Sequence, residues 1–179
     1  MVSINRWSLD DIWHYSRVNI DPWTETYSIP FYMYYTILWP ELAWTTRNND
    51  GNIVGYIIGQ ADTSTKGEEK GHVTAVTIAE DNRRTGLATL LMGLLEKASD
   101  EYFKAQFVDL FVRPTNHSAQ TMYNKMGYTL YRTIINYYAT LNEDGYDMRK
   151  SMPRDDKKKF MIPLPRPVTA DELDWKIKH

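Results

Sequence analysis

Residues 71–95 read GHVTAVTIAEDNRRTGLATLLMGLL, and this stretch decides the fold. The β-branched run 73–78 predicts a strand, and the apolar pattern of residues 86–102 predicts a helix. Between them, Arg83 and Arg84 precede a glycine at which the backbone can approach a ligand closely. Because unpaired N–H groups and the helix dipole attract anions, the loop predicts a pyrophosphate-binding turn. An ordinary strand-to-helix connection with two solvated arginines is the alternative.

The loop resembles the acetyl-CoA signature of the GNAT acetyltransferase superfamily, Arg/Gln-x-x-Gly-x-Gly/Ala. Its fixed positions hold Arg83, Gly86 and Ala88. The next block of the superfamily is a strand end, a short helix and a glycine-aromatic turn. A similar run here is Asn116-x-x-Ala119-x-x-x-Tyr123-x-x-x-Gly127-Tyr128. Two spaced motifs in the right order indicate a GNAT domain.

Shorter blocks resemble a narrower family, the catalytic subunits of NatB-type N-terminal acetyltransferases, and this similarity covers residues 4–167. The blocks are 21–22, 24–27, 29–32, 72–75, 108–113, 137–138 and 146–150. The resemblance implies an α/β (α+β) GNAT fold, with a mixed, largely antiparallel sheet flanked by helices. It also implies an enzyme that transfers acetyl from acetyl-CoA to the α-amino group of proteins beginning Met-Asp, Met-Glu, Met-Asn or Met-Gln.

The expected partners follow from the same resemblance and from the charge. The family works with a large auxiliary subunit on nascent protein N-termini, and the partner brings it to the ribosome. The formal net charge of -2 gives no electrostatic footprint for nucleic acid. Neither a signal peptide nor an apolar run near the ~20 residues that span a bilayer is found, so a cytoplasmic protein is expected.

The composition bounds the chemistry and the domain count. The chain has no cysteine, which excludes disulfides, thiolate metal sites and a Cys nucleophile, and no metal is expected. With 179 residues and 42% hydrophobic residues, one core suffices. We predict an N-acetyltransferase domain over 1–150.

Residues 151–179 form a tail that holds four of the eight prolines, and this spacing favours extended polyproline II structure. Its apolar residues indicate docking on the domain or on a partner, with a free solvated tail as the alternative. These residues are Phe160, Met161, Ile162 and Leu164.

Local signals place the remaining elements. Ser8 and Asp11 predict a capping box and a helix from Leu9 through Ser16 to Val18, which Asp21-Pro22 ends. Pro30 fits the first turn of a helix over 29–39, whose aromatic residues exceed what one core stripe needs. Asp50-Gly51 predicts a hairpin, Ser118 a cap for a helix over 119–126, and 142–145 a turn. The predicted strands are 2–7, 43–47, 53–61, 71–79, 107–112, 128–138 and 146–150.

Acetyl transfer from a thioester needs a neutral amine, a donor for the oxyanion and a proton for the departing thiolate. An N-terminal amine has a pKa near ~7.7–8.0, so a water can act as base, and the sequence leaves the base open. Tyr123 is the candidate general acid, with a packed core tyrosine as the alternative. The resemblance implies that backbone N–H groups at Val76 bind the acetyl carbonyl. The implied cofactor-binding residues are Val76, Ile78, Arg83, Arg84, Gly86, Leu87, Ala88, Asn116 and Tyr123.

His72 and Thr74 are two apart on one strand, so we expect them to share a face together with Val76 and Ile78. Their donors suit a second substrate residue that carries an acceptor oxygen, while a purely structural histidine is the alternative. The resemblance implies that Glu25 orients the amine or its water and that aromatic rings hold the initiator methionine. The expected catalytic residues are Tyr123, His72 and Glu25, and the expected substrate-binding residues are Glu25, Tyr27, His72, Thr74, Phe111, Tyr137 and Tyr138.

Two other functions fit the same loop. One is an acetyltransferase for lysine or small-molecule amines, which the blocks at 24–32 and 137–138 argue against. The other is a non-catalytic acyl-CoA-binding module. Turnover of a Met-Asp peptide distinguishes all three functions.

Overall fold

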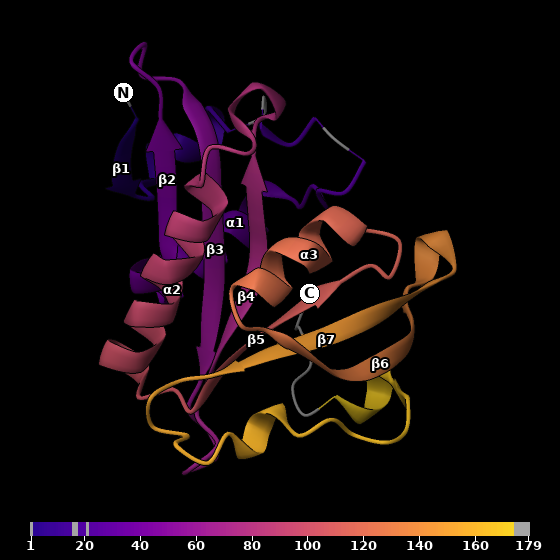
Figure 1. The fold of residues 1–179 in the computed structure, drawn as a ribbon. Helices are drawn as coiled ribbons and strands as arrows, with labels where there is room; N and C mark the ends of the chain where they lie inside the picture. The colour runs from indigo at the N-terminus through magenta and orange to yellow at the C-terminus, as the bar shows by residue number, and fades with distance from the viewer. Residues whose placement is uncertain (1, 16–17, 21, 174–179) are drawn as a thin grey trace.

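The computed structural model describes residues 2–15, 18–20 and 22–173 of the chain. They form an eight-stranded sheet in the order β1-β2-β3-β4-β5-β7-β6-β8 (Figure 1). Neighbouring strands are antiparallel except in the pairs β4–β5 and β6–β8. The predicted mixed, largely antiparallel sheet is therefore confirmed. The strands are β1 Ser3–Arg6, β2 Ala43–Arg47, β3 Ile53–Asp62, β4 Lys70–Ile78, β5 Phe107–Val112, β6 Thr129–Tyr138, β7 Glu143–Ser151 and β8 Val168–Thr169.

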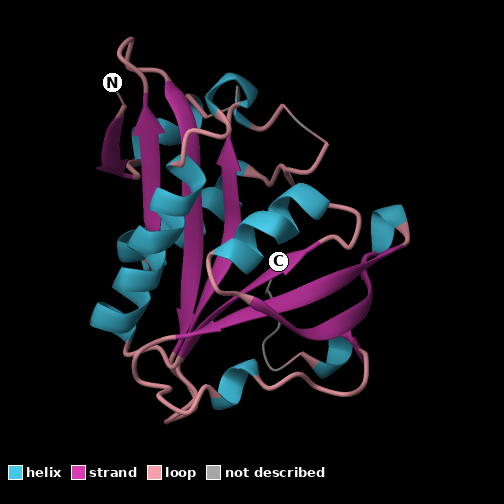
Figure 2. Cartoon of the chain, viewed as in Figure 1, coloured by secondary structure: helices cyan, strands magenta, loops and turns pink. Residues whose placement is uncertain are grey.

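Helices cover both faces of the sheet (Figure 2). Helices α2 and α3 lie on one face, and α1 lies on the other behind β3 and β4 (Figure 1). The α-helices are α1 Ile29–Leu38, α2 Leu87–Phe103 and α3 His117–Lys125. The 3₁₀ helices are η1 Leu9–Trp13, η3 Pro40–Leu42, η4 Glu80–Asn82, η5 Ala139–Leu141, η6 Lys159–Met161 and η7 Ala170–Glu172.

Each face of the sheet carries its own core. Under α2 and α3 the core is mostly aliphatic, with Leu91 and Leu95 of α2 packed among residues such as Val108 and Leu110 of β5. Under α1 it is aromatic, and the ring centroids of Trp7 and Tyr56 lie 4.8 Å apart. Aromatic side chains bury large areas, so a short helix and a 3₁₀ turn suffice to close this face.

Strands β4 and β5 separate along their length. They pair in parallel only from Lys70 to Val73 on β4 and from Phe107 to Leu110 on β5. Beyond that point the two strands diverge, and α3 crosses in front of the opening (Figure 1). The second half of β4 therefore lies beside the sheet's widest separation, next to the loop that begins α2.

The predicted N-terminal helix is shorter and tighter than the sequence pattern indicates. Ser8 and Asp11 form the predicted capping box, but they begin the 3₁₀ helix η1, which ends at Trp13. The prediction of a helix to Val18 is wrong, because η1 ends at Trp13 and His14, with φ -122°, leaves the helical conformation. Three residues of that prediction, Ser16, Arg17 and Asp21, lie outside the described residues. The buried side chains among the described residues of this segment are Asp11, Ile12, Tyr15 and Val18.

Helix α3 has a different cap from the one predicted. The side chain of Asn116 accepts a hydrogen bond from the Ala119 N–H at 3.1 Å, and this makes Asn116 the N-cap. Ser118 lies inside the first turn, so the predicted Ser118 cap is wrong. Either residue type can cap a helix, and the register of the β5–α3 loop selects Asn116.

The last hairpin also differs from the prediction. Residues 143–145 were predicted as a turn, but they belong to β7, and the turn lies earlier around η5 and Asn142, whose φ is +50°. Gly145 pairs with Ile134, and an added Cβ would lie only 3.0 Å from Cβ of Tyr137. This glycine therefore marks a close approach of Tyr137 to the strand.

The chain after β7 lies along the sheet as far as residue 173. Phe160 stacks on Phe107 with ring centroids 4.6 Å apart, and the Leu164 N–H donates to the Tyr131 carbonyl at 2.7 Å. Val168 in β8 is buried and adds a parallel strand beside β6. The division into a domain over 1–150 and a tail over 151–179 stays a prediction. Among the described residues, no helix is both long and apolar enough to span a membrane.

Candidate active site

The loop between β4 and α2 leaves a helix N-terminus open to a ligand. Gly86 is the N-cap of the 17-residue helix α2, with φ +86° and ψ -3°, and it provides no side-chain cap for the first-turn N–H groups. Arg84 is also left-handed, at φ +61°. Arg83 Nε donates to the Ile78 carbonyl at 3.0 Å, which fixes this arginine against the end of β4. The helix dipole and the two arginines therefore favour an anion here, and pyrophosphate binding at this loop stays a prediction.

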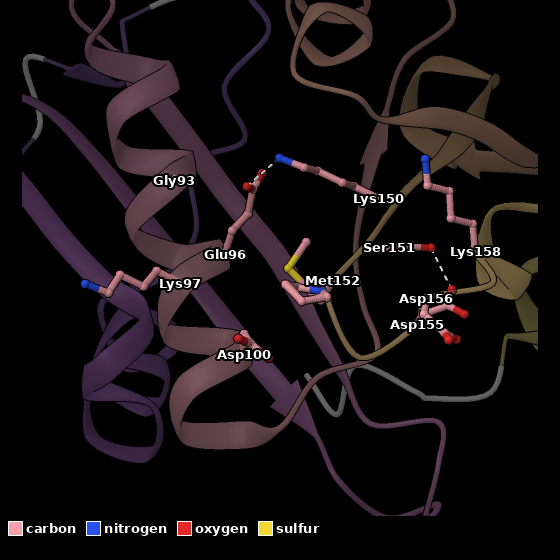
Figure 3. A pocket seen from close by; sticks show the side chains of 11 residues that line it. Gly93, Glu96, Lys97, Asp100, Lys150, Ser151, Met152, Asp155, Asp156 and Lys158 are labelled. Carbon is pink, nitrogen blue, oxygen red and sulfur yellow. Dashed lines mark hydrogen bonds and ion pairs between the residues drawn. The ribbon is translucent and has the colours of Figure 1, made fainter.

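Two grooves border α2. One, of about 470 Å³, lies next to the first turn formed by Leu87 and Ala88; it is lined by Thr89, Ser118, Thr121, Met122, Lys125 and Met126. The other, of about 560 Å³, lies between the second half of α2 and the chain that follows β7 (Figure 3). Among the residues that Figure 3 labels are Gly93 and the ion pair of Lys150 with Glu96. None of the predicted site residues is among the described residues that line the second groove.

A β-bulge in β4 separates the predicted site residues. Ile58 of β3 pairs with Ala75 and the next residue, Gly59, pairs with Val73, so Thr74 is an extra residue in β4. A bulge reverses the alternation of faces. The prediction that His72 and Thr74 share a face with Val76 and Ile78 is therefore wrong.

Side-chain contacts show the two faces. Val76 and Ile78 pack with the core under α2, whereas Ala75 packs with the aromatic core under α1. Thr74 lies near the phenol of Tyr35 of α1: burial raises the Tyr35 pKa, and the nearby Thr74 lowers it in part. Thr74 Oγ1 itself is buried and has no hydrogen-bond partner among the described residues. His72 lies on the same side as Thr74, because it contacts Asp109 and Phe111 on the face of β5 away from α2.

Aromatic side chains gather around His72 on this face. The rings of His72 and Phe111 are 5.0 Å apart, those of Phe111 and Tyr137 are 4.9 Å apart, and Tyr138 follows at 5.0 Å from Tyr137. Tyr27 stacks on Phe31 with ring centroids 4.0 Å apart. Burial and then Tyr27 raise the pKa of Tyr137, so Tyr27 lies near the same group. The structure thus brings together the predicted peptide-groove residues.

Glu25 is held by an arginine that the sequence analysis did not assign to the site. Arg113, at the end of β5, donates to the Glu25 carboxylate and to the Pro22 carbonyl, the latter at 3.0 Å. Its guanidinium carbon lies 5.0 Å from the Tyr138 ring centroid. This ion pair connects the loop before α1 to β5 and β6, so Glu25 has a fixed position at the edge of the aromatic group.

Tyr123 lies on the other side of the sheet, in α3. Its side chain is 7% exposed, and burial raises its pKa to about 12. The charge of Tyr123 contributes to the raised pKa of Tyr138, which places the two phenols near each other. The Tyr123 ring centroid lies 6.0 Å from that of Tyr128, within the core under α2 and α3. Asn116, a predicted cofactor ligand, is occupied as the cap of α3.

Sequence reasoning missed three residues that hold this site together. Asp109 and Arg113 appeared only as parts of a family block, and Tyr35 only as one of several helix aromatics. A charged residue inside the apolar run 107–112 was a usable signal, because a buried charge requires a partner. The described residues include no group of three or more metal-ligating side chains suited to a metal ion.

A sequence profile of the acetyltransferase (GNAT) family matches residues 9–128. The chain therefore belongs to the GNAT acetyltransferase family, as its loop and its second motif predicted. N-terminal acetyltransferases are among the proteins to which the chain is similar. The NAA20 catalytic subunit of the N-terminal acetyltransferase B complex of Arabidopsis thaliana is 46% identical over 176 residues, which are 98% of this chain and 99% of that protein.

Solved structures agree with this assignment. Naa20 of Chaetomium thermophilum, in complex with a bisubstrate analogue, superposes with a TM-score of 0.88 at 38% identity, covering 94% of this chain and 97% of that one. The NatB acetyltransferase complex bound to a bisubstrate inhibitor gives a TM-score of 0.81 at 31% identity, covering 97% and 99%. The predictions of a GNAT fold and of an N-terminal acetyltransferase enzyme are confirmed.

Proposed function

We propose that the chain transfers acetyl from acetyl-CoA to the α-amino group of proteins beginning Met-Asp, Met-Glu, Met-Asn or Met-Gln. It does so as the catalytic subunit of a NatB-type complex. The observation that carries the proposal is the bulge at Thr74, which directs one half of β4 toward the aromatic side chains around His72 and the other half toward the core beside the anion loop. A single strand can therefore contact a peptide and a thioester from opposite faces.

Acetyl-CoA binding is assigned to the start of α2 and to β4. The pyrophosphate fits the N–H groups around Gly86 together with Arg83 and Arg84. The acetyl carbonyl is assigned to the backbone at Val76, in the half of β4 beyond its pairing with β5. Backbone donors there need no particular side chain to stabilise a developing oxyanion.

The substrate amine needs little help from a general base. Its neutral form attacks the acetyl carbon, the new C–N bond forms, the C–S bond breaks and the proton of the amine passes to water. The Glu25 carboxylate is ion-paired with Arg113, so we assign it to orienting the amine or its water rather than to removing the proton.

The burial of Tyr123 changes the role that the sequence suggested. A phenol of pKa about 12 that gives its proton to a thiolate, whose conjugate acid is near ~8.5, does so uphill by ~5 kcal/mol. We therefore assign to Tyr123 a hydrogen bond to the departing sulfur, with the proton itself coming from solvent. The phenol remains protonated at every physiological pH, so this donor is always present.

Substrate selection is assigned to the groove around His72. The rings of Tyr27, Phe111 and Tyr137 suit the initiator methionine, and sulfur-aromatic contacts are favourable. His72 and Thr74 offer polar groups to the second residue. A substrate with Leu or Ala there leaves these groups unpaired, at about 1–3 kcal/mol each, so discrimination comes from rejection.

The auxiliary subunit is assigned to α1, whose outer side is apolar although its inner side already packs on the sheet. A helix that is apolar on all sides is usually buried, so this surface predicts a partner. The exposed apolar residues of α1 are Ile29, Met33, Tyr34, Ile37 and Leu38. Ribosome contact through that partner and a cytoplasmic location are further proposals, which ribosome sedimentation and imaging of a tagged chain test.

The test is an acetylation assay with a peptide panel, on the isolated chain and on its complex. Met-Asp, Met-Glu, Met-Asn and Met-Gln peptides should be acetylated, and Met-Leu, Met-Lys and an internal lysine should not. A preference for lysine or for small amines would replace the proposed substrate. Acetyl-CoA binding without turnover of any amine would favour the non-catalytic module.

A further inference from the structure

A line of buried charged side chains crosses the sheet on the same face as the peptide groove. Each member is at most 7% exposed, and successive members come from neighbouring strands. In register, His72 lies opposite Asp109, Asp109 lies opposite Arg149, and Asp147 lies opposite Arg132. The line thus runs from the groove on β4 through β5 and β7 to β6.

The contacts along this line divide it into two parts. His72 Nδ1 lies 2.6 Å from Asp109 Oδ1. Asp147 accepts from Arg132 Nε at 2.8 Å and from Arg149 Nη2 at 3.1 Å. Asp147 is therefore bracketed by two arginines, whereas the only hydrogen bond of Asp109 described in the structure is with His72.

The burial of the Asp109 carboxylate is unfavourable for the stability of the fold. It is 1% exposed, and its second oxygen has no hydrogen-bond partner among the described residues. Burial acts to raise the pKa of Asp109, but His72, Lys70 and Arg149 hold it below its usual value. A buried carboxylate with one oxygen unpaired adds little stability, so a role in function accounts for it better.

We propose that Asp109 is a positioning residue, which accepts a hydrogen bond from Nδ1 of His72 and so keeps that nitrogen protonated. The protonation of the other ring nitrogen, Nε2, then determines whether His72 binds an acidic or an amide side chain of the substrate. The inference rests on the proposed function of the groove. A carboxylate that accepts from one ring nitrogen fixes the tautomer and the ring plane. Nε2 then points away from Asp109, because the two nitrogens lie on opposite sides of the imidazole.

Both substrate types are then served by the same ring. For a second-residue amide, neutral His72 accepts from the substrate NH₂ at Nε2. For a second-residue carboxylate, His72 takes one proton from solvent, and Nε2–H donates to the substrate while Nδ1–H donates to Asp109. The imidazolium lies between two carboxylates, so Met-Asp binding takes up one proton and Met-Asn binding takes up none.

The surrounding groups set the conditions of the test. Lys70 and Arg149 are cations whose charges act on Asp109. The tyrosines stay neutral between pH 6 and 9, because burial raises their pKa. Burial and then Asp109 raise the pKa of Asp147, which makes Asp147 the group to control. The titratable groups that act on the pair from neighbouring strands are Asp62, Lys70, Tyr128, Tyr137, Asp147 and Arg149.

The experiment measures kcat/KM for Met-Asp and Met-Asn peptides from pH 6 to 9 on the full chain. The ratio of the two values cancels the ionisation of the substrate amine. In the wild type the ratio should fall as pH rises, approaching tenfold per pH unit. In Asp109→Asn the ratio should be about tenfold lower at pH 6 and flat with pH, while the KM for acetyl-CoA stays unchanged.

Two controls separate positioning from folding. Asp147→Asn removes another buried carboxylate from the same face and should leave the pH dependence of the ratio as in the wild type. In a His72→Ala background, Asp109→Asn should have no further effect on the ratio. An additive loss in the double variant, or a flat ratio in Asp147→Asn, would overturn the proposal.

A spectroscopic measurement keeps the inference separate from the proposed function and from the folding of any variant. The ¹⁵N shifts of the His72 ring in the wild type, assigned by their loss in His72→Ala, should show a protonated Nδ1. A spectrum with Nδ1 unprotonated overturns the role of Asp109 whatever the enzyme acetylates. If Nδ1 is protonated but no Met-Asp peptide reacts, the proposed function fails and the Asp109–His72 pairing stands.

Discussion

Replacing Gly86 by valine isolates the backbone geometry of the anion loop. Gly86 has φ +86°, and an added Cβ meets no heavy atom within 4 Å. The Cβ of valine therefore collides with nothing in the described structure, but the left-handed conformation costs an L-residue about 1–2 kcal/mol. If the loop relaxes to a negative φ, its N–H groups turn away from the bound anion. The same free energy then appears as weaker acetyl-CoA binding, a rise in KM of about 5- to 30-fold.

The assay is steady-state acetylation of a Met-Asp peptide with acetyl-CoA varied. The KM for acetyl-CoA should rise in Gly86→Val, and the KM for the peptide should change little. Gly86→Asn is the matched variant, since asparagine tolerates the left-handed region, and it should raise KM much less.

Gly51→Val is a second control, which introduces the same backbone strain in a turn outside the anion loop. Gly51 in the β2–β3 hairpin has φ +79° and also open space around its Cβ position. Gly51→Val should lower the free energy of unfolding by a similar amount and leave KM unchanged. An unchanged KM in Gly86→Val, or an equal rise in Gly51→Val, would refute the reasoning.

Four further outcomes follow from the structure. Tyr123→Phe should lower kcat about 10- to 150-fold with little change in peptide KM, because this fold-change corresponds to the loss of one hydrogen bond to a charged group. A 10³-fold loss of kcat would instead indicate that Tyr123 transfers its proton fully. The free energy of unfolding should fall between pH 10 and 12. In the folded chain burial raises the pKa of Tyr15 and of Tyr123 to about 12, whereas the unfolded chain releases these protons near pH ~10. Equal stability at pH 9 and 11 in denaturant titrations would contradict this. Gly93→Ala should raise the unfolding free energy by about 0.5–1 kcal/mol, since Gly93 lies inside α2 with open space at its Cβ position, and a loss of stability would show that the helix needs the glycine. Ile37→Ser on the exposed side of α1 should weaken co-purification with the auxiliary subunit, whereas Leu130→Ser on β6, also exposed, should not, and equal effects would place the partner elsewhere.

The elements that local sequence determines were predicted well. Strand Phe107–Val112 has the predicted bounds, because an apolar run ended by Pro114 leaves little freedom. The Asp50-Gly51 turn forms where the sequence places it, with Gly51 left-handed. The predicted N-terminal helix failed because distant residues decide it. Asp11 is ion-paired with Arg47 of β2, and a chain held to the sheet in this way takes the 3₁₀ spacing.

The candidate site was predicted in its members but not in its arrangement. Family motifs identified His72, Thr74, Glu25 and Tyr123, yet no local pattern reveals a bulge, which depends on the register against β3. The partners that hold these residues come from strands far along the chain, as Asp109 does. Pairings of this kind are fixed by topology, so a sequence without an alignment leaves them open.

In the proposed function, the bulge at Thr74 lets one short strand contact two substrates. In a regular strand, His72 and Val76 would face the same side, and the peptide pocket and the core beside the cofactor loop would compete for one surface. One inserted residue reverses the second half of β4, so Val76 packs under α2 while Thr74 and His72 face α1 and Asp109. The backbone between them passes from one face to the other at the place where the acetyl carbonyl is assigned. The position of this single residue therefore links the fold to the chemistry more directly than any side chain in the site.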